Sequence, residues 1–132
     1  MNLNSFMESY AQEIQGQYSE YNDTVNIIIV PLVDERFQTV FGQVTKHEWY
    51  DKEVIELSSK VCEYEDSINL KELMEENTNF CHGKFSIVDD YIQVEATFFV
   101  ENVNEETLKE AIQEVANLAD EYEFKLTGAD VH

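Results

Sequence analysis

The sequence predicts one domain of the α+β class, residues 1–132, with the element order α-β-β-β-α-β-β-α. Apolar residues recur at helical spacing near both ends of the chain, and β-branched, alternating stretches lie between them. The predicted strands are close together in sequence, which favours an antiparallel sheet. With three helices for five strands, we expect the helices to pack mainly on one face of that sheet.

The N-terminal half predicts a helix and then three strands. Gly16 follows the first helical stripe and is typical of a helix C-cap. Residues 24–32 are rich in β-branched side chains, and residues 37–46 and 55–62 alternate between apolar and polar. Residues 47–52 are expected to form a polar connection. The first helical stripe consists of Leu3, Phe6, Met7, Tyr10 and Ile14.

The C-terminal half predicts a short helix, two strands and a long helix. Asn69 with Glu72 three residues later resembles a capping box, and Gly83 follows the short helix. Residues 84–88 and 91–101 are the predicted strands, joined across two aspartates. The inner side of the short helix is expected to carry Leu70, Leu73, Met74 and Asn77. The final helix is expected from Asn104 to about Thr127, with Gly128 after it and a stripe of Leu108, Ile112, Val115, Ala119, Tyr122 and Leu126.

The chain is strongly acidic, with 8 Lys and Arg against 28 Asp and Glu, a formal net charge of -20. No Lys or Arg precedes Arg36. This charge repels phosphate backbones and anionic membranes, so neither nucleic acid nor membrane is expected as a partner. A partner should be basic or should dock through apolar surface.

The compartment expected from the sequence is the cytoplasm. The N-terminus has no basic region of the kind that begins a signal peptide, and the longest apolar run, residues 27–33, is far too short to span a membrane. Two cysteines, Cys62 and Cys81, do not make a disulfide framework. Whether they ever pair stays open at this point.

No set of residues predicts a reaction. The sequence lacks nucleophile-elbow, P-loop and dinucleotide-binding motifs. His47 with Glu48 and Asp51 is a weak metal-site candidate, and solvated surface is the better interpretation. Cys81-His82 suggests a nucleophile, but a turn with a buried thiol explains it more simply. We therefore expect no catalytic residues, no cofactor and no metal.

The strongest functional indication is that the predicted strands are apolar on both sides. A sheet covered by helices on one face should alternate cleanly between apolar and polar. The strand over residues 24–32 instead carries a run of isoleucine and valine, and large apolar patches seldom stay unused. The residues expected to form a partner or dimer surface are Ile28, Val30, Phe37, Phe41 and Phe99.

A set of residues in the C-terminal part also matches, in type and spacing, the pattern of a known group of proteins. Its residues are Leu73 and Met74, Asn77, Gly83-Lys84-Phe85, Ile92 and Val94, Leu108, Ile112, Ala119-Asp120 and Leu126. In spacing and element order the chain resembles the type III secretion chaperones and the related YbjN family of sensory transduction regulators. The resemblance implies a homodimeric, ATP-independent protein that holds a segment of a partner protein and has no catalytic residues.

Three functions are therefore open. The first is a non-enzymatic protein-binding module of the secretion-chaperone kind. The second is a YbjN-like regulator that acts on a signalling or stress pathway through protein contacts. The third is an acidic decoy that mimics nucleic acid and binds a basic protein.

Overall fold

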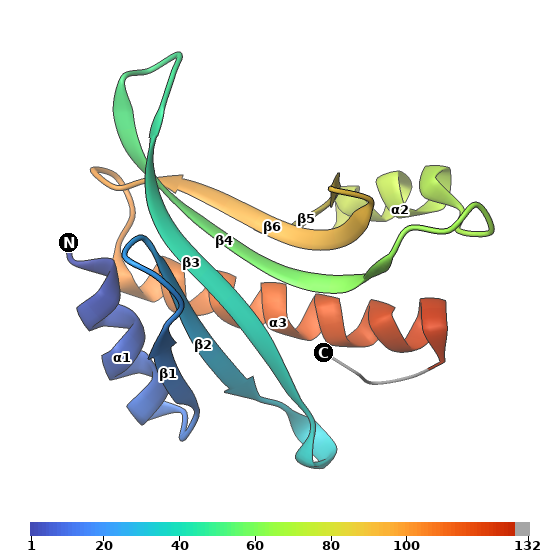
Figure 1. The fold of residues 1–132 in the computed structure, drawn as a ribbon, viewed down its shortest axis with the longest axis horizontal. Coiled ribbons are helices and arrows are strands. Elements are labelled where there is room, and N and C mark those ends of the chain that lie inside the picture. The colour runs from blue at the N-terminus through green and yellow to red at the C-terminus, as the bar shows by residue number, and fades with distance from the viewer. Residues whose placement is uncertain (129–132) are drawn as a thin grey trace.

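The computed structural model describes residues 1–128 and contains three α-helices on a six-stranded antiparallel sheet (Figure 1). The strand order across the sheet is β1-β2-β3-β4-β6-β5. Along the chain the elements are α1 (Leu3–Glu13), β1 (Gln17–Glu20), β2 (Val25–Pro31), β3 (Phe37–His47), β4 (Lys52–Glu63), α2 (Leu70–Glu76), β5 (Lys84–Val88), β6 (Tyr91–Phe99) and α3 (Glu105–Thr127). The predicted α+β class and antiparallel sheet are confirmed.

The structure contains one strand more than the sequence predicted. The edge strand β1 pairs with β2 in the register Tyr18↔Ile28. Its four residues are mostly polar and too few for an alternation to stand out, so sequence reasoning missed it. Two predicted N-caps are confirmed, since the side chains of Asn69 and Asn104 accept hydrogen bonds from the N–H groups of Glu72 and Thr107. The predicted C-cap at Gly16 is wrong, because α1 is capped at Ile14 and Gln15 takes the left-handed conformation after it.

Both long helices pack on the same face of the sheet. α1 lies over β1, β2 and β3, and α3 lies over β3, β4 and β6. Gly42 of β3 lets α1 approach closely, because a Cβ atom there would meet the sulfur of Met7 at 2.7 Å. Ile28 and Val30 point into this helix-covered face and are fully buried. They belong to the core, which corrects their assignment to a partner surface.

The short helix α2 contributes less to the core than its sequence pattern suggested. Leu73 is buried as predicted. Met74 is 71% exposed, so the prediction that it lies on the inner side of the helix is wrong. A cluster of aromatic rings near α2 links the start of β5 to α3: Tyr122 contacts Phe85 edge-to-face at 4.7 Å, and Phe80 contacts both rings.

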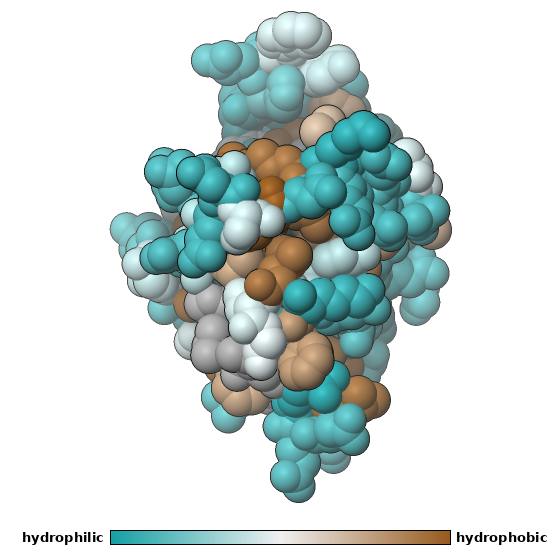
Figure 2. All heavy atoms as spheres, turned by 90° about the vertical axis from the view of Figure 1, so that its right-hand side faces the viewer, coloured by the Kyte–Doolittle hydropathy of each residue, from teal (hydrophilic) through white to brown (hydrophobic). Residues whose placement is uncertain are grey.

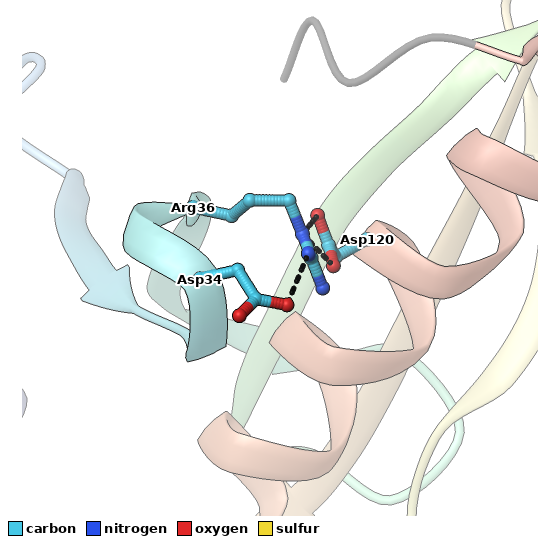
Figure 3. A network of polar contacts seen from close by, with 3 residues as sticks. All are labelled: Asp34, Arg36 and Asp120. Carbon is cyan, nitrogen blue, oxygen red and sulfur yellow. Dashed lines mark hydrogen bonds and ion pairs between the residues drawn. The ribbon is translucent and has the colours of Figure 1, made fainter.

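An ion pair joins the connection between β2 and β3 to the middle of α3 (Figure 3). Arg36 Nε donates to the carboxylate of Asp120 at 3.0 Å, and a second guanidinium nitrogen lies 3.4 Å from Asp34. The Asp120 side chain is only 7% exposed. Arg36, the first basic side chain in the sequence, thus supplies a charged donor to a mostly buried carboxylate of α3.

Replacing Arg36 by glutamine should lower the free energy of unfolding by about 1–3 kcal/mol, because a mostly buried carboxylate loses its charged donor. Lys71→Gln is the matched control, since it removes an exposed cation that pairs with Glu75 one turn along α2. The control should change stability by at most ~0.5 kcal/mol. Urea unfolding followed by circular dichroism measures both, and equal losses would contradict a structural role for the Arg36–Asp120 pair.

Candidate functional site

The face of the sheet opposite the helices is the candidate site. On β2 and β3 the side chains that alternate with the core residues point to this open face. One half of the face is apolar, with Phe37 54% exposed and its neighbours partly exposed. We call this area the apolar half; it consists of Val25, Ile27, Ile29, Phe37 and Phe41.

The structure brings together only part of the predicted surface. Phe37 and Phe41 lie on the open face, within the apolar half. Phe99 faces the same side at the far end of β6, where Tyr50 packs edge-to-face on it at 5.1 Å and the Lys52 ammonium lies 5.5 Å from its ring centroid. It is therefore partly covered by its own chain and separate from the other two phenylalanines.

Sequence reasoning missed the residues of β2 that accompany the phenylalanines. Ile27 is the partner of Phe41 in the β2–β3 register, so it shares the open face. All residues from Ile27 to Val30 are apolar, and the alternation therefore gave no signal to separate inner from outer.

The open face is hollowed at its centre. A hollow of about 670 Å³ extends from Tyr21 and Val25, next to the β1–β2 edge, to Val88 and Asp89 at the β5–β6 turn. Phe41 forms part of its apolar side, and the Tyr21 ring contacts Phe41 edge-to-face at 6.3 Å. This combination of concave shape and apolar lining suits a bound side chain better than a flat, solvated sheet would.

The other half of the hollow is polar and acidic. Glu56 is held in place by two donors: Gln43 Nε2 lies 3.1 Å from one carboxylate oxygen, and Thr45 Oγ1 lies 3.0 Å from the other. Glu95 accepts a hydrogen bond from Gln93 at 3.2 Å. We call Glu56 and Glu95, together with Asp89, the acidic half of the hollow.

One cation also lines the hollow. The Lys60 ammonium lies 5.3 Å from the ring centroid of Tyr91, so it is directed over an aromatic ring. With three carboxylates and one ammonium, the lining residues carry net negative charge. The hollow therefore offers apolar contact at one side and electrostatic attraction for a cation at the other.

Two other surfaces expose large apolar side chains. At the tip of the β3–β4 hairpin, which projects from the body in Figure 1, Trp49 is 86% exposed. At the end of the molecule where α2 and the last turns of α3 lie, hydrophobic side chains are visible between hydrophilic ones (Figure 2). A smaller hollow of about 440 Å³ there is lined in part by Ile68, Leu73 and Leu126.

The Cys81-His82 candidate proves to be a structural connection to α3. The backbone N–H groups of Cys81, His82 and Gly83 donate to the carboxylate of Glu114 at 2.9, 2.6 and 2.9 Å. Burial alone would raise the pKa of Glu114, but these three donors and the nearby His82 outweigh it and hold the pKa below its usual value. The Cys81 thiol is exposed, contrary to the buried thiol that the sequence suggested.

Removing the charge of Glu114 should destabilise the protein at neutral pH. Glu114→Gln is expected to cost about 1–2 kcal/mol, because three backbone donors lose a charged acceptor. The lowered pKa means that this stabilisation is present above the ordinary glutamate pKa and disappears as the pH falls through the folded-state pKa. Chemical denaturation from pH 7 to pH 3 should therefore show the two proteins converging in acid.

Glu121→Gln is the control for that comparison, since Glu121 is exposed on the same helix and pairs with the exposed Lys125. Its stability difference from the wild type should stay within ~0.5 kcal/mol at every pH. A constant gap between wild type and Glu114→Gln across the pH range would contradict the role given to the carboxylate.

The metal candidate around His47 has no support from the side-chain arrangement. His47 is exposed at the end of β3, and its Nδ1 accepts a hydrogen bond from the Trp49 N–H at 3.2 Å. Within residues 1–128, no three His, Cys, Asp or Glu side chains gather in a way that could hold a metal ion. In the same range, no helix is long and apolar enough to cross a membrane.

Comparison with known proteins gives a fold and no family. No protein-family model matches the chain, and no curated protein matches its sequence. Among solved structures, the chain is similar to one in the HopA1–SchA chaperone–effector complex, with a TM-score of 0.59, 11% identity, and 92% of each chain covered. This likeness confirms the predicted secretion-chaperone-like fold, whereas the resemblance to the YbjN family finds no support in the sequence comparisons.

Proposed function

We propose that this protein is a non-enzymatic protein-binding module that holds a segment of a partner protein against the open face of its sheet. The observation that carries the proposal is the apolar half of that face, where Phe37 is exposed and Phe41 partly exposed on the side of the sheet that the two long helices leave uncovered. Large apolar side chains gathered on one exposed surface are typical of a docking site. The fold it shares with a chain of a chaperone–effector complex supports the same role.

The polar groups of the domain favour binding over catalysis. Asp120 and Glu114, two carboxylates drawn toward the interior, are both engaged in contacts that fix loops to α3. The carboxylates of Glu56 and Glu95, which do line the central hollow, accept hydrogen bonds from Gln43, Thr45 and Gln93, so they too are engaged within the surface of the sheet. Cys62 and Cys81 are both free thiols, which supports a reducing compartment and hence the cytoplasm.

The apolar half also helps to choose among the three functions that the sequence left open. An acidic decoy would bind through charge alone, and nothing in that role requires exposed phenylalanine and isoleucine on one sheet face. A YbjN-like regulator would use the same apolar contacts, and it differs from a chaperone-like module in the identity of its partner. Identification of the bound protein therefore separates those two roles.

Removing the aromatic ring of Phe41 tests whether the open face is the binding surface. Phe41→Thr keeps a residue that suits a strand and removes most of the apolar contact, so capture of the specific partner from a native lysate should fall about tenfold. Immobilised wild type and variant are compared by quantitative mass spectrometry. Phe124→Ser is the control, because Phe124 is a solvent-exposed phenylalanine, more exposed than Phe41, that lies on α3, in the other layer.

The result is decisive only if both variants fold, which circular dichroism and thermal melting establish first. Proteins that are lost from Phe41→Thr and retained by Phe124→Ser are the expected outcome. Equal capture by all three proteins would refute the assignment of the open face as the binding surface.

Self-association is the second part of the proposal. Its physical basis is that exposed apolar surface favours pairing, while a net charge of -20 on each copy opposes it. Added salt screens the repulsion and leaves the apolar contact intact. The dimer should therefore strengthen as salt rises from ~20 mM to ~500 mM, the reverse of an ion-paired interface. Sedimentation equilibrium measures this, and a monomer at both salt concentrations would exclude a homodimer.

A further inference from the structure

The two halves of the central hollow differ in character along a single row of side chains. Following the strand pairing, Ile27 of β2 lies beside Phe41 of β3, then Ser58 of β4, then Glu95 of β6. All four face the open side. The row continues to Lys84 at the β5 edge, whose ammonium donates to the backbone oxygens of Asn77 and Phe80. From Ile27 to Glu95 the row changes from apolar to acidic, so a ligand that crosses it meets apolar side chains first and a carboxylate second.

The acidic half of the hollow, made of Glu95 in this row and Glu56 in the neighbouring row, is held in place before any ligand binds. Gln43 and Thr45 hold the carboxylate of Glu56 between strands β3 and β4, and Gln93 holds that of Glu95. A fixed carboxylate loses little conformational freedom on binding a cation, so its attraction is less offset by ordering. Lys60 supplies one positive charge at the edge of the hollow and leaves an excess of negative charge.

The spacing between the two halves suits an extended polypeptide. Phe41 and Glu95 are two strands apart, which corresponds to about 10 Å. In an extended segment, residues i and i+2 point to the same side and lie ~6.6 Å apart. A long basic side chain at i+2 spans the remaining distance, while an apolar side chain at i stays over Phe41.

We propose that the open face selects partner segments that are extended and carry an apolar residue followed two positions later by Lys or Arg. The apolar side chain packs between Phe41 and Ile27, and the basic side chain reaches Glu56 and Glu95. This inference rests on the proposed binding function and adds to it the chemical class of the segment. An acidic segment of the same shape is repelled by the hollow and by the net charge of the whole chain.

Synthetic nine-residue peptides test the inference without knowledge of the natural partner. The probe has serine at alternate positions, and leucine and lysine in turn at the positions between them. Two matched peptides replace its lysines by glutamate or by serine. Titration into ¹⁵N-labelled protein reports both affinity and location, and the lysine probe should shift the amides of Phe41, Glu56 and Glu95. The glutamate peptide should bind at least ~10-fold more weakly.

The double variant Glu56→Gln/Glu95→Gln tests the acidic half directly. It should weaken the lysine probe about 5–10-fold and leave the uncharged serine peptide unchanged, because each exposed charge pair contributes only a few-fold in affinity. Glu8→Gln/Glu121→Gln is the matched control, since it also removes two negative charges, but from the exposed surfaces of α1 and α3. This control should bind the lysine probe like the wild type.

The outcomes also separate this inference from the proposed function. Equal binding of the lysine and glutamate peptides, or equal weakening in both double variants, would overturn the selection for basic segments. If Phe41→Thr lowers capture of the partner in that case, the open face remains a binding surface with another selectivity. A lysine probe that shifts no amide of the open face at its solubility limit would likewise overturn the inference.

Discussion

The packing of both long helices on one face of the sheet is the constraint on which the other features depend. α1 covers the first three strands and α3 covers the middle of the sheet, so one continuous core forms between the two layers. A two-layer domain of this size leaves the second face of its sheet to solvent. Everything proposed about function follows from the side chains on that uncovered face.

The long helix α3 organises the loops as well as the core. Its inner stripe packs on the sheet, and two of its carboxylates receive loop donors at points far apart in sequence: Asp120 holds Arg36, and Glu114 holds the turn that contains Cys81. Such charge-assisted contacts fix direction more strictly than apolar packing does. They place the ends of β2 and β5 and thereby help to set the shape of the open face.

The acidic side chains have different effects on association in different parts of the surface. Most carboxylates lie in solvent and oppose association in general, while Glu56 and Glu95 lie in a hollow beside apolar side chains. A carboxylate next to apolar surface attracts cations more strongly, because the low-dielectric wall reduces screening by water. General repulsion combined with local attraction would favour a basic segment over the many acidic surfaces of a cell.

The sequence by itself determined the class, the order of all elements except β1, the N-termini of α2 and α3, and the end of α3 at Gly128. Those features are local: Asn69 and Asn104 cap helices through their own neighbours, and the stripe from Leu108 to Leu126 repeats with the helical period. The tertiary structure alone decided which face of β2 is buried. Because residues 27–30 are all apolar, only the docking of α1 and the pairing with β3 place Ile28 inside and Ile27 outside. The hollow likewise depends on pairing between strands far apart in sequence, such as Ser58 with Glu95, which no local pattern records.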